Sequence, residues 1–418
     1  MRKLALMMVC ISLLLTGCWD YQEVDRLATV LAIGIDSLPG NKSILLTVQI
    51  ANPVLKGGGG QSAGGGAMGA KAFTVMNSEG ETVSEAVRNL SPQSTRRILF
   101  SHCKEIVIGK NLAETGMVGI LDYLKRDREL RRTEWILTTD KTAKEILESD
   151  ITMEQVPARG LEHILLNYQT EGRVLAIDLN DFFNRLNGDS HVSFAPLVQL
   201  EDIDQQVNTQ LEKATGKALD SEKKPETITI GTMAVFKNLK MVGVLDEDDS
   251  RDLKWLVDSP KGSSIKVAYS PVSQTNGNKG EIALDIVSGK STITPQISEN
   301  GITMNIALTA NVALHETGTS DAKVLDPKVV EQIEQQAADT MKLQMEHTID
   351  IAQNELRSDC VGFAESIHNH YPNEWKSMKD NWEDIFPTLD YQVFCKVMIL
   401  RTGMINNPSL PGEAGGLN

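Results

Sequence analysis

The residues whose types and spacing indicate a defined chemistry lie near the N-terminus, in Leu15-Thr16-Gly17-Cys18. Arg2 and Lys3 open the chain, and an apolar run over 4–15 follows them. A positive start, a short apolar core and a small-residue cleavage site are the layout of a secretory signal peptide. A cysteine directly after the small residues makes this the pattern of a bacterial lipoprotein. We expect cleavage between Gly17 and Cys18, diacylglycerol on the Cys18 thiol and an acyl chain such as palmitate on its new N-terminus.

The expected lipid would hold the protein at the outer face of the cell membrane without a transmembrane helix. The run over 4–15 is too short to span a bilayer, which takes about 20 residues. No later stretch approaches 18 consecutive apolar residues. Two fatty chains hold a protein stably at a membrane, whereas one does so only marginally. The alternative is a simple signal peptide with a chance cysteine.

Trp19 and Asp20 directly follow the expected lipid site. They are candidates for contact with the membrane interface or with a partner protein. The alternative is that they only position the anchor or suit its processing.

The other candidate motifs, for catalysis or for metal binding, do not have the spacing or the sequence context that such sites require. No zinc-binding HExxH motif occurs, and the GxSxG letters at 60–64 lie in a glycine-rich stretch without the following helix that a nucleophile elbow needs. His368-Asn369-His370 lacks the spacing of three or four that puts metal ligands on one helix face, which favours a polar surface patch. The Asp246–Asp249 run lacks the loop pattern of a calcium site and is interpreted as a solvated face. His102 and Cys103 would diverge on a strand. The sequence therefore predicts no catalytic residue, no metal site and no cofactor beyond the covalent lipid.

Charge and cysteine content narrow the class of protein further. The 418 residues carry a formal charge of −15, which becomes about −17 without segment 1–17. An acidic body argues against nucleic acid, whose binding proteins carry a basic face. It also makes the lipid the means of membrane attachment. Beyond the N-terminus stand Cys103, Cys360 and Cys395, with no CxxC pair, so buried thiols are favoured. A bridge between Cys360 and Cys395 remains an alternative.

Alternating strand-like and helix-like segments predict an α+β protein. Behind the lipoprotein signal peptide we expect three domains, each a mostly antiparallel or mixed β-sheet flanked by α-helices. Their expected bounds are 27–171, 172–259 and 260–403, after a lipidated link over 18–26 and before a frayed tail over 404–418. A glycine-rich loop at 56–70 lacks the Gly-Lys-Ser/Thr ending and following helix that a phosphate-binding loop needs. Segment 201–226 is a polar insertion, and 326–357 is a long helix.

Three local signals make sharper predictions. Ser78 and Glu81 have the spacing of a capping box, which predicts a helix start there. Gly289 is expected to separate strands at 282–287 and 291–297. Asp326 followed by a proline predicts the start of the long helix, because aspartate caps helices and proline suits their first position.

The chain resembles the Ger(x)C lipoprotein family, the C subunits of nutrient germinant receptors in endospore-forming bacteria. Matching motifs run in order along nearly the whole chain. They are Gly17-Cys18-Trp19-Asp20, Glu23, Ile33-Gly34-Ile35-Asp36, Glu85-Ala86-Val87-Arg88-Asn89-Leu90-Ser91, Ser101-His102, Val107-Ile108-Gly109, Leu121-Asp122-Tyr123, Gly231-Thr232-Met233-Ala234-Val235-Phe236, Gly362-Phe363, Trp375 and Trp382. The glycine-rich loop, the polar insertion and Cys103 depart from the pattern.

The resemblance implies a non-enzymatic subunit on the outer face of the inner spore membrane. It would work with an integral-membrane A subunit and a transporter-like B subunit, and the complex would start germination when nutrients arrive. The family fold is three domains of sheet and helix. Two alternatives come from other classes. One is a solute-binding lipoprotein that captures a small nutrient directly, and the other is a cell-envelope hydrolase, for which no nucleophile, base or metal set is found.

Overall fold

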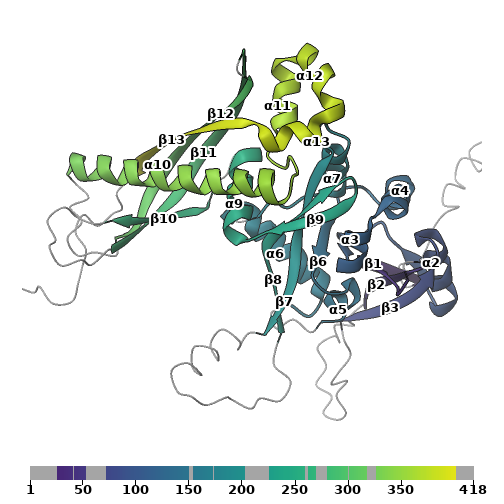
Figure 1. Ribbon diagram of the computed structural model, residues 1–418. Helices are drawn as coiled ribbons and strands as arrows, with labels where there is room; N and C mark the ends of the chain where they lie inside the picture. Colours follow the sequence, from purple (N-terminus) through teal and green to yellow (C-terminus); the bar gives the residue numbers. More distant parts are fainter. Residues whose placement is uncertain are drawn as a thin grey trace, which may run out of the picture.

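Two β-sheets with helices packed around them form the protein, which confirms the expected α+β class (Figure 1). The computed structural model describes residues 26–40, 42–52, 72–149, 154–172, 174–202, 226–258, 262–269, 280–299, 301–317 and 326–401. The glycine-rich loop and the expected tail fall outside these ranges. So does the interior of the polar insertion, whose two ends belong to paired strands, at Asp202 and Glu226.

The first sheet is mixed and has the strand order β3-β2-β1-β5-β6-β7-β8-β9, with β4 paired to β1. Its strands are β1 (Leu27–Ser37), β2 (Ile44–Ala51), β3 (Phe73–Gly80), β4 (Arg97–Leu99), β5 (Glu105–Ile108), β6 (Trp135–Thr139), β7 (Val192–Asp202), β8 (Glu226–Lys237) and β9 (Lys240–Leu245). The central β1-β5-β6-β7 pairings and the β1-β4 pairing are parallel, whereas the β3-β2-β1 and β7-β8-β9 pairings are antiparallel. Parallel neighbours need crossover connections, which here contain helices.

The helices of this region are α2 (Val83–Leu90), α3 (Lys110–Thr115), α4 (Val118–Arg126), α5 (Ala143–Glu148), α6 (Pro157–Glu171), α7 (Leu179–Leu186) and α9 (Glu247–Val257). The expected arrangement of one sheet per domain differs from the structure in one respect. Strands β6 and β7 lie on either side of the expected boundary at 171/172, yet they pair with each other. The strands of the expected first and middle domains therefore form one sheet, and the boundary itself stays a prediction.

The second sheet has the order β10-β11-β12-β13, with strands at β10 (Ser264–Tyr269), β11 (Gly280–Ser298), β12 (Gly301–Thr317) and β13 (Asp390–Arg401). Strand β13 is parallel to β12 and is reached through α10 (Pro327–Asp350), a π turn (Ile351–Glu355), α11 (Phe363–His370), α12 (Pro372–Met378) and α13 (Trp382–Ile385). Helix α10 lies across this sheet (Figure 1). Val393 and Val397 of β13 are buried, whereas Phe394 and Met398, which point to the other face, are exposed.

The three local predictions have different outcomes. Asp326 caps α10, since its carboxylate accepts the backbone N–H of Lys328 at 3.0 Å. The capping box at Ser78 was wrong: Thr82 caps α2, and its hydroxyl accepts the N–H of Glu85 at 3.2 Å. Strand β3 pairs with β2 through Gly80, so the helix begins only after that residue.

The break expected at Gly289 was also wrong. Strand β11 runs through it, and Gly289 pairs with Ala310 of β12. The register of this pair shifts instead at two earlier places, between Ala283 and Leu284 and between Ile286 and Ser288.

Candidate functional site

The residues predicted to carry the lipid and its cleavage site, Gly17 and Cys18, lie outside the described part of the chain. The same holds for Trp19 and Asp20, the candidate contacts with membrane or partner. The first residue that the structure describes is Arg26, one residue before β1. None of the described helices is both long and apolar enough to cross a bilayer. The lipid anchor therefore stays a prediction.

Two of the motif segments meet at the end of β1. The Asp36 carboxylate accepts the backbone N–H groups of Ala143 at 2.7 Å and Lys144 at 3.1 Å, at the start of α5. Gly109 follows β5 and lies so close that a Cβ there would collide with this carboxylate. Burial raises the pKa of Asp36, while these two N–H donors lower it. The glycine therefore leaves room for a buried side chain that joins β1 to a helix 107 residues away.

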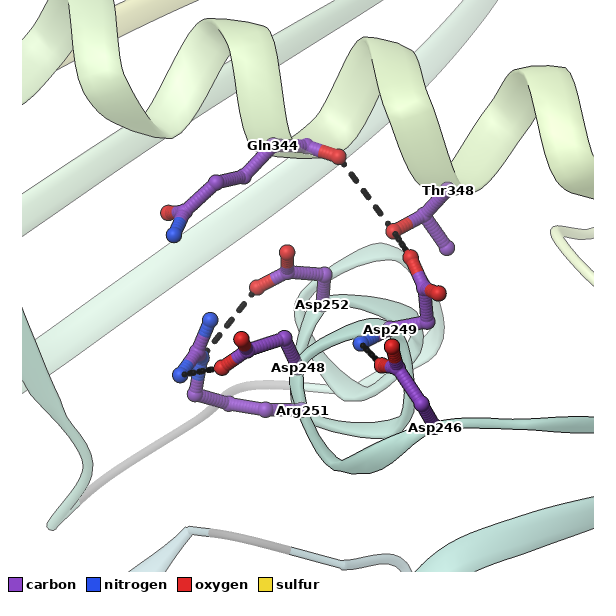
Figure 2. A network of polar contacts seen from close by, with 7 residues as sticks. All are labelled: Asp246, Asp248, Asp249, Arg251, Asp252, Gln344 and Thr348. Carbon is purple, nitrogen blue, oxygen red and sulfur yellow. Dashed lines mark hydrogen bonds and ion pairs between the residues drawn. The ribbon is translucent and has the colours of Figure 1, made fainter.

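One polar contact between the two sheets is made by α9 and α10. Helix α9 follows β9 of the first sheet and packs against both α10 and β11 of the second. Figure 2 shows the network of side chains at this interface. The Thr348 hydroxyl of α10 donates to the Asp249 carboxylate at 2.8 Å and approaches the Gln344 carbonyl at 3.3 Å. Thr348 is fully buried and Asp249 is 4% exposed.

Arg251 holds the other end of this network. It donates to Asp248 at 2.8 Å and to Asp252 at 3.3 Å (Figure 2). Asp252 is 3% exposed, and its desolvation raises its pKa to about 7 in spite of Arg251. Burial also raises the pKa of Asp249, while the hydrogen bond from Thr348 lowers it. Protonation of Asp252 near neutral pH would therefore change the charge of this interface.

Sequence reasoning missed this site by interpreting the 246–249 run as a solvated face. Asp246 does cap α9, since its carboxylate accepts the N–H of Asp249 at 2.9 Å. A signal for burial was present, because residues 249, 252, 253 and 256 have the i, i+3, i+4, i+7 spacing of a buried helix face. All four are buried.

A second anchor lies between the π turn and α11, at Asp359. This buried carboxylate accepts the backbone N–H groups of Gly362, Phe363 and Ala364, at 3.0, 3.0 and 2.7 Å, at the start of α11. It also accepts the indole N–H of Trp382 at 3.2 Å. The Trp382 ring packs edge-on against Trp375 at 5.0 Å between centroids. One carboxylate therefore positions the whole helical cap α11–α13.

That cap also contacts the part of the chain that forms the first sheet, through Asp189 in the turn before β7. The indole N–H of Trp375 donates to one carboxylate oxygen of Asp189 at 3.2 Å. Nδ1 of His368 lies 2.6 Å from the other. Glu383 adds an ion pair with Lys237 of β8 at 3.1 Å. The histidine predicted to belong to a polar surface patch thus lies on the surface but joins two parts of the chain.

Next to these contacts lies a cleft of about 620 Å³. Its walls come from α7 and the following turn on one side, and from the segment 359–370 on the other. Charged and polar groups of both parts face it, including Arg185, Ser190 and Glu365. The junction therefore contains both a set of hydrogen-bonded contacts and an open cleft of mixed polar and apolar lining.

The cysteines in the described ranges are not activated as nucleophiles. Cys103, Cys360 and Cys395 are free thiols, so no bridge joins the last two. Burial raises the pKa of Cys360 and Cys395 to about 12 and that of Cys103 well above its usual value, which keeps them protonated and weakly nucleophilic. Within the described ranges, no three His, Cys, Asp or Glu side chains gather as a metal site requires.

Comparisons with known proteins agree with this architecture. Residues 20–200 match a family model described as the spore germination protein N-terminal domain. Residues 231–403 match one described as spore germination B3/GerAC like, C-terminal. The two models together span both sheets.

Curated relatives from Bacillus subtilis (strain 168) match over nearly their whole length. Spore germination protein KC is 28% identical, with 97% of each chain covered. Spore germination protein B3 is 23% identical, with 94% of this chain and 96% of the relative covered. The crystal structure of the GerBC protein shares the fold, with a TM-score of 0.50 and 18% identity over 88% of this chain and 96% of that one. The chain therefore belongs to the Ger(x)C family of spore germination proteins.

Proposed function

We propose that this chain is a non-enzymatic, lipid-anchored subunit of a nutrient germinant receptor, working beside integral-membrane A and B subunits. The observation that carries the proposal is the match of both family models, which assigns the chain to spore germination proteins. The first model begins at residue 20, two residues after the expected anchor at Cys18. The lipid would confine the body to the membrane and raise its effective concentration near its partners.

The junction between the sheets supports a role in surface recognition. Contacts from Asp189, Asp249 and Glu383 tie the two sheets together through buried or charge-assisted hydrogen bonds. Such bonds fix geometry more strongly than neutral surface contacts do. The body would therefore present one shape to the A and B subunits, on the outer face of the membrane and, in the spore, of its inner membrane.

Cys18→Ala tests the anchor. We expect this variant to leave the membrane fraction of spores and the nutrient response to fall, while the A and B subunits remain in the membrane. Cys10→Ala is the matched control, because Cys10 lies in the segment that cleavage removes and alanine keeps it apolar. A Cys18→Ala protein that stays in the membrane fraction and supports a normal response would contradict the anchor.

Capture of the partner subunits tests the scaffold. The tagged A subunit should recover the B subunit from wild-type spore membranes. It should recover clearly less from spores that lack this chain. Equal recovery from both would show that the receptor assembles without this chain and would overturn the scaffold role.

A further inference from the structure

The cleft between the two sheets has the size and position of a small-molecule site. Its volume of about 620 Å³ falls within the roughly 300–1,000 Å³ typical of ligand pockets, which occur preferentially between domains. Its lining combines apolar side chains, among them Val192, Leu256 and Val361, with a few polar groups. Val192 belongs to β7 and Leu256 to α9, whereas Val361 lies just before α11, so both halves of the molecule contribute.

Arg185 of α7 supplies a positive charge without an ionic partner. Its guanidinium stacks on the ring of Phe194 at 4.5 Å from the centroid, which fixes its plane. Among the described residues, no oxygen accepts a hydrogen bond from this guanidinium. Burial lowers its pKa, whereas the nearby carboxylates of Asp181, Glu365 and Asp258 raise it. The guanidinium thus keeps a set of fork-shaped donors facing the cleft, a geometry that suits a carboxylate.

Glu365 of α11 supplies a negative charge on the opposite wall. Its Oε1 accepts the hydroxyl of Ser190 at 3.0 Å and the Ser190 N–H at 3.4 Å. Its Oε2 is buried and has no hydrogen-bond partner among the described residues. Glu365 lines the cleft through the rest of its side chain, so its carboxylate contributes a negative charge that a cationic ligand group would meet there.

We propose that this cleft binds a small zwitterion of the amino-acid type, with the ligand carboxylate on Arg185 and the ligand ammonium on Glu365. The charge balance distinguishes this class of ligand from its competitors. A simple anion would meet Arg185 but would be repelled by Asp181 and Glu365. A simple cation would meet the carboxylates but leave the guanidinium unpaired. A molecule with both charges satisfies the two walls at once and would draw the two sheets together. This inference stands apart from the proposed role as a tethered subunit.

The test is titration calorimetry and thermal unfolding of the full-length lipoprotein in detergent. The probes are the standard amino acids, taken one at a time, each with its N-acetyl derivative and its amide. We expect at least one amino acid to bind and to raise the melting temperature. Its two derivatives each lack one charge and should bind roughly tenfold to hundredfold more weakly, as expected for the loss of a charge-assisted contact.

Arg185→Gln and Glu365→Gln should each weaken binding by a similar factor. Arg126→Gln and Glu148→Gln are matched controls, because both side chains are exposed and belong to i, i+4 ion pairs outside the cleft. Asn369→Trp at the exposed rim tests the site without disturbing a buried group, and it should block binding.

Failure of every amino acid to give heat or a melting shift would overturn the proposal. Equal binding by the single-charge derivatives would do the same, as would unchanged binding in Arg185→Gln and Asn369→Trp. None of these results bears on the anchor, because Cys18→Ala is scored by membrane fractionation.

Discussion

The hydroxyl of Thr348 on α10 donates a 2.8 Å hydrogen bond to the Asp249 carboxylate on α9, within an interface that buries both side chains. Helix α9 continues from β9 of the first sheet and α10 covers the second, so this bond spans the junction between them. The two residues are 99 positions apart in the chain. Their contact is therefore a measure of how firmly the two sheets are joined.

Thr348→Val should destabilise the protein. Valine keeps the shape of the side chain but removes the donor, which leaves a buried carboxylate oxygen unpaired at a cost of about 1–3 kcal/mol. Urea unfolding measures the difference. Thr340→Val is the control, because the Thr340 hydroxyl is half-buried and bonds only to the Gln336 carbonyl of its own helix. Equal losses in the two variants would show that the bond to Asp249 adds nothing.

Asp252 should make stability depend on pH. Its folded pKa of about 7 exceeds the unfolded value of about 3.9, so the folded chain binds this proton more tightly. The free energy of unfolding therefore rises as pH falls through 7 towards 4. From pH 8 to pH 5 the wild type should gain about 1–3 kcal/mol more than Asp252→Asn, which stays neutral throughout.

Chemical unfolding at several pH values, with both proteins compared at each, measures this difference. Asp248→Asn is the control, because Asp248 shares Arg251 as partner but its side chain is 76% exposed. Parallel pH curves for the wild type and Asp252→Asn would rule out the effect.

Gly109→Ala should destabilise the first sheet. The new Cβ would collide with the Asp36 carboxylate and displace it from the N–H groups of Ala143 and Lys144. Losing a buried, charge-assisted cap should cost about 2–4 kcal/mol. Gly119→Ala is the control, because its Cβ would meet nothing within 4 Å and alanine favours the helix. In thermal unfolding, the melting temperature should fall for Gly109→Ala and rise for Gly119→Ala. Similar shifts of the melting temperature in both variants would refute the steric account.

Asp359→Asn should loosen the helical cap α11–α13. An amide offers one acceptor oxygen where the carboxylate offers two, yet three backbone N–H groups and the Trp382 indole donate there. We expect a loss of about 2–4 kcal/mol, visible in the fluorescence of Trp382 during unfolding. Asp326→Asn is the control, since asparagine caps a helix as well as aspartate does. If Asp359→Asn, like the control, has the same free energy of unfolding as the wild type, Asp359 does not position the cap.

Local signals in the sequence predicted much of the secondary structure. Apolar runs predicted β1 and β2, helix periodicity predicted α7 and α9, and Asp326 with its following proline predicted the start of α10. These features depend on neighbours within a few residues, where backbone preference and capping decide. The α+β class follows from the same local patterns.

The tertiary structure decided what distant segments do together. Pairing of β6 with β7 merged two expected sheets, because strand partners are chosen by burial and crossover geometry over long separations. The hydrogen-bond partner of Asp249 comes from α10, 99 residues later in the chain. The sequence by itself determined the lipoprotein signature, the family motifs and the local elements. The junction, its carboxylates and the cleft arose only when the two sheets packed, because burial and charge pairing are properties of the assembled core.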